Sequence, residues 1–299
     1  MNVPQPFQYQ GSKRSLAPLI LDFLPKKFHR LVEPFAGSAA MSIACAARSR
    51  ASRYWINDLN KPLAELVNLI INRPEEVADH YTNLWKADAE DALEHYYTVR
   101  EAFNRTQDPK LFLYLLARCI KGAVRYNTDG LFNQSPDKRR LGTRPETMRQ
   151  NIMGASMLLR GKTVVTSHDF RDVLAAVDEN DIVYMDPPYQ GTSGDRDSRY
   201  LAGLSFDQFV AALDGLNSRG LRYVISYDGR TGEKSYGEPL PAYLSLSLVE
   251  LDAGRSTQAT LLGREEKTVE SLYLSPTLAA ELPSVPKIVT RNLEQSVLF

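Results

Sequence analysis

The sequence has few of the residues that build covalent or metal-centred frameworks. Its 299 residues include two cysteines, Cys45 and Cys119, and four histidines. Both cysteines lie in apolar, helix-like stretches, so we expect reduced core residues and neither a disulfide framework nor a zinc site. No metal is therefore expected at a functional site.

Long apolar runs and an excess of one charge are also missing. No run is long enough to span a bilayer, and the opening MNVPQPFQYQGSK lacks the apolar core of a secretory signal. We therefore expect a cytoplasmic protein. Lys plus Arg total 36, as do Asp plus Glu, so the net charge is zero. Only local charge can indicate a nucleic-acid partner.

Strand-like runs alternate with amphipathic helical patterns. This alternation predicts an α/β fold with a mostly parallel, doubly wound sheet of seven strands, the last two forming an antiparallel pair at one edge. The predicted strands are Leu31–Phe35, Arg53–Ile56, Thr163–Thr166, Asp181–Met185, Leu221–Ser226, Tyr243–Val249 and Val269–Leu274.

The alternation is interrupted between residues 61 and 160. The helical patterns there are Pro62–Ile71, Pro74–Trp85, Ala92–Asn104, Pro109–Lys121 and Pro145–Leu159. Before the last of them, Asp129-Gly130 lies between two aromatic-containing segments, which is a strong hairpin signal. We predict a catalytic domain from residues 1–60 and 161–275, a helical insert with a β-hairpin at 61–160, and a proline-containing polar tail at 276–299.

A small-residue turn follows the first predicted strand. Glu33-Pro34-Phe35-Ala36-Gly37-Ser38 would let a ligand approach the backbone at a helix N-terminus. Asp58 follows the second strand, where a carboxylate suits ribose hydroxyls. A tight structural turn would use the same small residues, so it is the turn and Asp58 together that predict a nucleotide-type site.

A second motif, Asp186-Pro187-Pro188-Tyr189, follows the fourth predicted strand. The Asp186 carboxylate and the Pro187 carbonyl could accept the two hydrogens of an aromatic amine, and Tyr189 offers a ring on which a base can stack. Two acceptors would localise the amine lone pair for attack on a sulfonium methyl, by positioning and electrostatics. A proline-rich loop with a core tyrosine is the alternative, but the hydrophobic strand before the motif favours function.

In their order these motifs resemble a known family, the D12 class (alpha group) of DNA adenine N6-methyltransferases, whose cofactor motif is N-terminal. The resemblance is carried by Phe7–Lys13, Glu33–Gly37, Asn57–Asn60, Arg125–Asn133, Asp169-Phe170 and Asp186–Tyr189. It implies a Rossmann-like fold and site-specific transfer of methyl from S-adenosylmethionine to a flipped adenine in double-stranded DNA. It also implies a bacterial or phage-infected host cell.

The resemblance also implies residue roles. Cofactor contacts would come from Tyr9, Lys13, Glu33, Pro34, Phe35, Gly37, Ser38, Asp58, Asp169, Phe170 and Asp186. Asp58 would hold the ribose, Asp169 and Phe170 would lie against the adenine, and Asp186, Pro187, Pro188 and Tyr189 would grip the target base. Residues 61–160 would recognise the DNA, with Gln8 and Arg125 touching bases.

Three positions depart from the family pattern. Ala39 stands where a second glycine is usual, and Tyr9 stands where tryptophan is frequent. Gln134-Ser135-Pro136 replaces the usual hydrophobic residue and proline after the hairpin. The sequence therefore does not predict the DNA target.

Local charge supports a DNA partner. Residues 118–149 carry three acidic residues and eight basic ones, Arg118, Lys121, Arg125, Lys138, Arg139, Arg140, Arg144 and Arg149. Clustered around a predicted hairpin, these basic residues favour phosphate contact over a merely solvated helix face. We expect DNA contacts from Gln8, Arg125, Asn127, Asn133, Lys138, Arg139 and Arg140.

Several alternatives stay open. A cytosine N4-methyltransferase would use similar acceptors, although the motif order and the hairpin favour adenine. A non-catalytic DNA-binding module could keep the fold, although the intact Asp58, Asp186 and Tyr189 argue against it. Residues 190–203 are either a loop that closes over DNA or a plain surface loop. Ser226-Tyr227 either line the base pocket or pack in the core.

Two partners are also open. Gln295, Leu298 and Phe299 resemble the short peptides by which bacterial replication proteins dock on the sliding clamp, although an apolar end that packs on its own domain is an alternative. A cognate restriction endonuclease is a second possible partner, and the sequence does not separate a restriction-linked enzyme from a solitary or phage-borne one.

Overall fold

A nine-stranded sheet organises the described part of the chain. The computed structural model describes residues 3–87, 91–188, 204–231, 234–236, 239–255, 267–284 and 288–289. Among these residues the sheet order is β3-β2-β1-β4-β5-β8-β7-β9, with β6 paired to β5. The strands are β1 (Phe28–Glu33), β2 (Ala51–Asn57), β3 (Thr163–Thr166), β4 (Asp181–Met185), β5 (Arg222–Thr231), β6 (Lys234–Tyr236), β7 (Ser247–Arg255), β8 (Lys267–Leu274) and β9 (Ile288–Val289).

The first five strands are parallel, as the sequence predicts. β1 pairs with β2 and with β4, β2 pairs with β3, and β4 pairs with β5. β8 is antiparallel to both β5 and β7. The order reverses between β1 and β4, so the carboxyl ends of neighbouring strands flank a crevice there, which is where such sheets bind ligands.

The predicted count of seven strands was wrong. β6 spans three residues and β9 spans two, which is too short for a hydrophobic alternation to show in the sequence. β9 pairs with β7, and helix α11 (Pro276–Glu281) contacts β5. Part of the segment predicted as a tail therefore extends the sheet.

Several predicted boundaries also move, and two of these shifts have a clear local cause. β7 begins at Ser247 and not at Tyr243, because a short 3-10 helix, η2 (Ala242–Leu244), follows Pro241 and ends at Ser245, whose φ is 52°. Helix α6 ends at Arg118, before the predicted Lys121, because Cys119 is extended and Lys121 adopts a φ of 60°.

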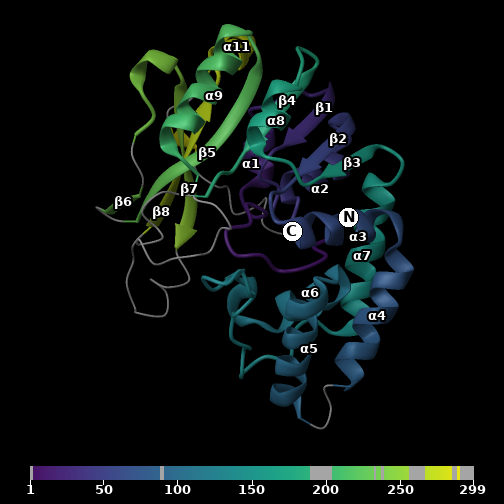
Figure 1. The fold of residues 1–299 in the computed structure, drawn as a ribbon. Coiled ribbons are helices and arrows are strands. Elements are labelled where there is room, and N and C mark those ends of the chain that lie inside the picture. Colours follow the sequence, from purple (N-terminus) through teal and green to yellow (C-terminus); the bar gives the residue numbers. More distant parts are fainter. Residues whose placement is uncertain are drawn as a thin grey trace.

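Helices cover both faces of the sheet (Figure 1). Leu31, Ile182 and Val224 point to the face shared with α1 (Ala17–Leu21) and α2 (Ala40–Ala47), whereas their neighbours Val32, Val183 and Ile225 pack against α8 (Phe170–Ala175) and α9 (Phe206–Ser218). Successive side chains on a strand alternate between faces, so two cores arise from one set of apolar strands. In the described ranges no helix combines the length and apolarity needed to cross a bilayer.

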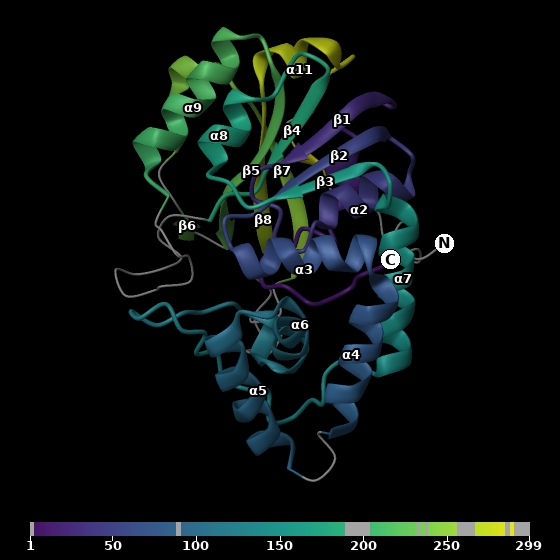
Figure 2. The same cartoon turned by 45° about the vertical axis from the view of Figure 1, so that its right-hand side comes forward.

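The helical segment inserted between β2 and β3 lies beyond one end of the sheet (Figure 2). Its helices are α3 (Lys61–Asn72), α4 (Pro74–Ala87), α5 (Ala92–Thr106), α6 (Pro109–Arg118), η1 (Ile120–Gly122) and α7 (Pro145–Leu159). Phe103 and Phe112 stack with ring centroids 4.8 Å apart, and Phe132 meets both rings edge-on. This aromatic cluster anchors the loop between η1 and α7.

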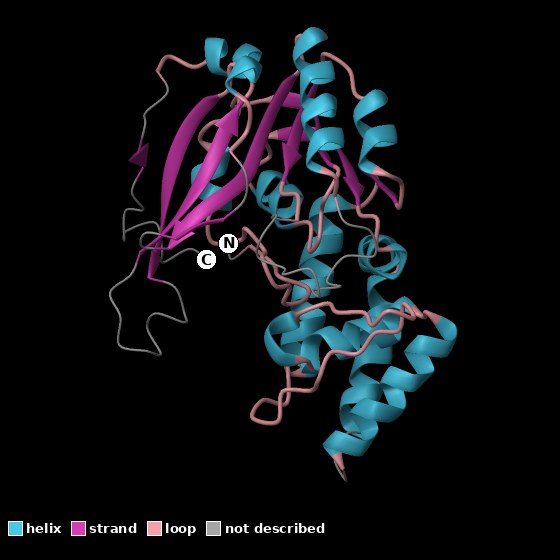
Figure 3. Ribbon diagram, turned by 60° about the vertical axis from the view of Figure 1, so that its left-hand side comes forward, coloured by secondary structure: helices cyan, strands magenta, loops and turns pink. Residues whose placement is uncertain are grey.

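That loop turns back on itself as a hairpin. It contains no named strand, so it is coloured as loop in Figure 3. Asn127 N–H donates to the Leu131 carbonyl at 2.9 Å, and Asn133 N–H donates to the Arg125 carbonyl at 3.0 Å. The Asn127 side-chain oxygen accepts from the N–H groups of Asp129 and Leu131. Tyr126 and Phe132 form a single antiparallel bridge, so the turn is present but extended strands are not.

Residues 3–15, here called the N-terminal strap, run between the sheet and the insert (Figure 2). Gln10 N–H donates to the Gly122 carbonyl at 3.1 Å. Gly122 has a φ of 60°, and a Cβ added to it would lie 2.5 Å from the Gln8 carbonyl oxygen. Only glycine permits this contact between strap and insert.

We predict that Gly122→Ala destabilises the fold. Its methyl group would combine left-handed strain with a backbone collision, lowering the free energy of unfolding by about 2–4 kcal/mol. Gly130→Ala is the matched control, because Gly130 also has a positive φ of 74° but has no atom within 4 Å of its added Cβ. It should cost only about 1 kcal/mol. Denaturant unfolding measures both, and equal losses would contradict the close contact.

Candidate active site

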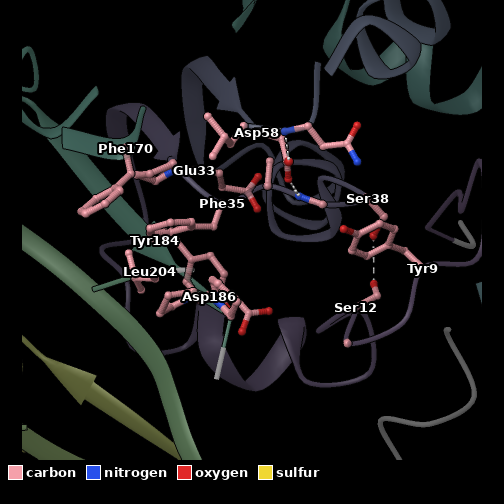
Figure 4. A pocket seen from close by; sticks show the side chains of 18 of the residues that line it. Tyr9, Ser12, Glu33, Phe35, Ser38, Asp58, Phe170, Tyr184, Asp186 and Leu204 are labelled. Atoms are coloured by element: carbon pink, nitrogen blue, oxygen red, sulfur yellow. Dashed lines mark hydrogen bonds between the residues drawn. The ribbon is translucent and has the colours of Figure 1, made fainter. Parts of the chain in front are cut away.

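A cavity of about 270 Å³ opens at the carboxyl ends of the first four strands (Figure 4). Its size is near the lower limit for small-ligand pockets, about 300–1,000 Å³. It is lined by the loops after β1 to β4, by the strap, by Val124 and Tyr126 of the insert, and by Leu204 and Gln208. The sheet alone does not close it.

The residues predicted from the sequence come together here. The lining includes Tyr9, Lys13, Glu33, Pro34, Phe35, Gly37, Ser38, Asp58, Asp169, Phe170, Asp186, Pro187 and Pro188. Tyr189 and residues 190–203 lie outside the described residues. Segments far apart in the chain therefore share one cavity.

Asn57 fastens the loops that form the cavity floor. Its amide nitrogen donates to the Pro34 carbonyl at 2.9 Å and to the His168 carbonyl at 3.0 Å. Its amide oxygen accepts from the Thr166 hydroxyl at 2.7 Å and the His168 N–H at 2.8 Å. The side chain is fully buried, so these four bonds satisfy it completely and set the spacing of the loops after β1 and β3.

Asp58 holds the small-residue turn. One carboxylate oxygen accepts from Gly37 N–H at 2.8 Å, and the other accepts from Asn60 N–H at 2.9 Å. Burial raises the pKa of Asp58, although these two bonds oppose the shift. Each carboxylate oxygen keeps acceptor capacity for a ligand hydroxyl.

The turn itself is shaped by close contact with the strap. A Cβ on Gly37 would lie 2.9 Å from Cε1 of Tyr9, so only glycine lets this ring lie over the turn. The Ser12 and Ser38 hydroxyls are 3.0 Å apart. Ala39, which replaces the second family glycine, takes a left-handed φ of 53°, so the chain keeps the turn despite the added methyl.

One wall of the cavity is aromatic. The ring centroids of Phe35 and Phe170 lie 5.2 Å apart at 33°, which provides an apolar surface suited to a planar ring. Asp169 caps α8 by accepting from Arg171 N–H at 2.9 Å, and it pairs with the Arg171 guanidinium at 2.8 Å. The hydrogen bond from the Arg171 side chain lowers the pKa of Asp169.

A buried ammonium lies between two carboxylates at the opposite wall. Lys13 Nζ is 3.0 Å from Asp186 Oδ1 and 3.7 Å from Glu270 Oε2, and Lys13 is 6% exposed. Sequence reasoning missed Glu270. The available signal was a charged residue within the apolar run of β8, two strands from β4.

Two further buried polar groups flank this ion cluster. Glu33 Oε2 accepts from the Ser42 N–H at 2.8 Å and from the Ser42 hydroxyl, and burial raises the pKa of Glu33 to about 7. The hydroxyls of Tyr184 and Ser226 are 2.8 Å apart. Tyr184 lines the cavity, whereas Tyr227 packs on Phe209 in the core.

The residues predicted to contact DNA lie at the insert and the strap. Exposed positions are Gln8, Arg125, Asn133, Lys138, Arg139 and Arg140. Asn127 instead uses its side-chain oxygen to hold the hairpin turn. One of the eight basic residues was wrongly assigned to the phosphate-facing cluster, and another has an ionic partner of its own. Arg118 is 3% exposed and donates to the Arg140 carbonyl, and Arg149 pairs with Asp79.

Comparison with known proteins decides the family. A family model described as D12 class N6 adenine-specific DNA methyltransferase matches residues 9–236, which is most of the chain. The chain belongs to this family. The resemblance drawn from the motifs is thus confirmed, and the α/β sheet is the Rossmann-like fold of a D12-class methyltransferase.

Bacterial and phage methylases are similar to this D12-class chain. The DNA adenine methylases of Salmonella typhi and of Escherichia coli (strain K12) are each 31% identical over 186 residues, which cover 61% of this chain and 63% of each relative. The DNA N-6-adenine-methyltransferase of Escherichia phage P1 is 27% identical over 234 residues, 75% of this chain and 29% of that protein. The match thus spans just under two thirds of the two bacterial relatives.

We predict a pH-dependent contribution of Glu33 to stability. Its folded-state pKa of about 7 lies above the ordinary value of 4.5, so the folded state binds the proton more tightly. The stability contributed is fully present below pH 4.5 and is lost as the pH rises to about 7, by roughly 3 kcal/mol in total. Glu33→Gln should remove this trend while its amide oxygen still accepts from Ser42. Unfolding free energies from pH 4 to 8 test this, and parallel curves would contradict it.

Proposed function

We propose that this chain transfers the methyl group of S-adenosylmethionine to N6 of a flipped adenine at a specific site in duplex DNA. The observation that carries the proposal is the shared cavity. It brings Asp186-Pro187-Pro188 at the end of β4 together with the Gly37 turn and Asp58 at the ends of β1 and β2. An amine-gripping motif and a nucleotide-type site thus open onto the same space.

The residues present fit the cofactor. Phe35 and Phe170 offer a surface for its adenine, and Asp58 offers acceptors for its ribose hydroxyls. We propose that Tyr9, Lys13, Glu33, Pro34, Ser38, Asp169 and Asp186 complete this site. When bound, the cofactor supplies an electrophilic methyl group on a sulfonium.

The target amine would be held by Asp186 and Pro187. The carboxylate and the carbonyl accept its two hydrogens, which directs the nitrogen lone pair toward the methyl group. The ion pair with Lys13 fixes the orientation of the Asp186 carboxylate. Tyr189, outside the described residues, would stack on the base. The rate enhancement would come from positioning and from preorganised charge.

Duplex DNA would be held by the insert and the strap. Arg125 and Asn133 are joined by a backbone hydrogen bond and are both exposed on the hairpin, and Lys138, Arg139 and Arg140 are exposed close by in the chain. The target adenine must leave the base stack, because an amine inside the duplex cannot reach a cavity at the strand ends. Gln8 and Arg125 would contact base edges.

We predict that Asp186→Ala abolishes transfer of labelled methyl from S-adenosylmethionine to unmethylated bacterial DNA. Loss of one acceptor should lower the rate by more than about 100-fold. Calorimetry should show that cofactor binding is weakened but not lost, because Asp186 is one of several proposed cofactor contacts. Asp178→Ala is the control, because this exposed carboxylate lies just before the amino-terminal end of β4, whereas Asp186 follows its carboxyl end.

Nucleoside analysis then identifies the base. Label in N6-methyladenine supports the proposal, whereas label in N4-methylcytosine would show that the substrate is cytosine. A wild-type protein that binds cofactor but labels no duplex would overturn the function. Mapping the methylated sites also tests for a cognate restriction endonuclease, because such a nuclease would cleave only the unmethylated sequence.

We further propose that Gln295, Leu298 and Phe299, which lie outside the described residues, dock on a bacterial replication sliding clamp. The support is the resemblance of their spacing to clamp-binding peptides. Deleting residues 295–299 should abolish retention on immobilised clamp and leave methylation of a short duplex unchanged. Equal retention of the full chain and of the chain without residues 295–299 would contradict clamp docking.

A further inference from the structure

We propose that a second pocket, next to the cavity, binds one phosphate of the DNA backbone close to the target nucleotide. This inference rests on the proposed function, since DNA supplies the phosphate. The strap pocket, as we call it, is lined by Gln5, Gln8, Tyr9, Ser12, Arg14, Ser15 and Lys121. All of its side chains carry a polar group.

The strap pocket has the charge of an anion site. Its lining holds two cations, Arg14 and Lys121, and no carboxylate. Neither cation forms an ion pair with any residue in the part of the chain that the structure describes. In a protein whose acidic and basic residues are equal in number, a hollow lined only by cations and neutral donors is complementary to phosphate.

Arg14 is held in place before any ligand arrives. One guanidinium nitrogen donates to the Gln5 side-chain oxygen, and the other donates to the Val3 carbonyl at 3.0 Å. Gln5 is itself anchored, because its N–H donates to Asn151 of α7 at 3.0 Å. The buried Nε–H of Arg14 has no hydrogen-bond partner among the described residues. A guanidinium has five N–H donors, so two bonds orient it and leave donors for a ligand.

Lys121 reaches the strap pocket through a strained backbone. Its φ of 60° is left-handed, which costs a non-glycine residue about 1–2 kcal/mol. Gly122 then packs against the backbone of Gln8, which brings η1 onto the strap. Strain of this kind persists where a functional geometry requires it, and here it places an exposed ammonium at the pocket lining.

The position of the strap pocket identifies which phosphate it would take. Tyr9 and Ser12 line both the strap pocket and the cavity, so the two spaces share a wall. A phosphate in the strap pocket would therefore belong to a nucleotide at or next to the one whose base enters the cavity. Gln8, expected at a base edge, lies on the same rim. The strap pocket would thus anchor the backbone while the target base is out of the stack.

The test measures binding of the full chain to a duplex carrying the mapped target, with S-adenosylhomocysteine present, over a range of salt concentrations. We expect Arg14→Gln and Lys121→Gln each to weaken binding regardless of sequence and to reduce the slope of log K against log salt by about one. The double variant should lose little more than either single variant, because both side chains serve one phosphate. Lys121→Gln leaves the strap hydrogen bonds intact, so it decides the matter even if Arg14→Gln does not fold.

Lys26→Gln is the matched control. Lys26 is exposed just before the amino-terminal end of β1, and the cavity lies at the carboxyl end of that strand. It should leave both affinity and slope unchanged. A second experiment replaces single phosphates of the duplex by neutral methylphosphonates. At one position near the target, this replacement should weaken binding by the wild type. At the same position it should not weaken the already reduced binding by Lys121→Gln.

The outcomes separate this inference from the proposed function. Unchanged slopes, additive losses in the double variant, or no shared methylphosphonate position would overturn the inference while duplex binding still supports the function. Inorganic phosphate that binds the wild type but not Lys121→Gln, with unchanged duplex slopes, would assign the strap pocket to free anions and also overturn it. A wild type that binds no duplex at all would overturn the function itself.

Discussion

The site depends on one buried amide. Asn57 ends β2, and its four side-chain hydrogen bonds join the loops after the two neighbouring strands, β1 and β3. Because the side chain is fully buried, losing it would leave several polar groups without partners at once. Asp58 follows directly and receives the Gly37 N–H, so the spacing that Asn57 sets is passed on to the turn. The cavity floor is thus as rigid as the sheet beneath it.

The rest of the site is closed by segments that do not belong to the parallel strands. The strap brings Tyr9 over the turn and Lys13 to Asp186, and the insert contributes Val124 and Tyr126. The Asn60 side chain donates to the Tyr126 hydroxyl at 2.9 Å, which ties the insert to the end of β2. The same elements that would read DNA therefore also form walls of the cavity, so the two tasks share their scaffold.

Sequence reasoning succeeded where the signal was local. Apolar runs predicted β1 to β5, and compact motifs such as Asp186-Pro187-Pro188 predicted residues that line the cavity. It failed where distant contacts decide. Glu270 comes to Lys13 only because β8 pairs with β5, and Arg118 is buried because it meets the Arg140 carbonyl. The early end of α6 and the short strand β9 depend on contacts in the folded chain, which leave no periodic pattern in the sequence.

The strap has a consequence for how the protein is made. Lys13 precedes its two ionic partners, Asp186 and Glu270, by well over a hundred residues, so both emerge from the ribosome much later than Lys13 does. Gly122, against which the strap packs, also follows after more than a hundred residues. Because chains are synthesised from the N-terminus, the strap cannot make its full set of contacts until β8 is complete. The wall of the cavity that contains the Lys13 ion pairs is therefore completed only after β8 has been synthesised.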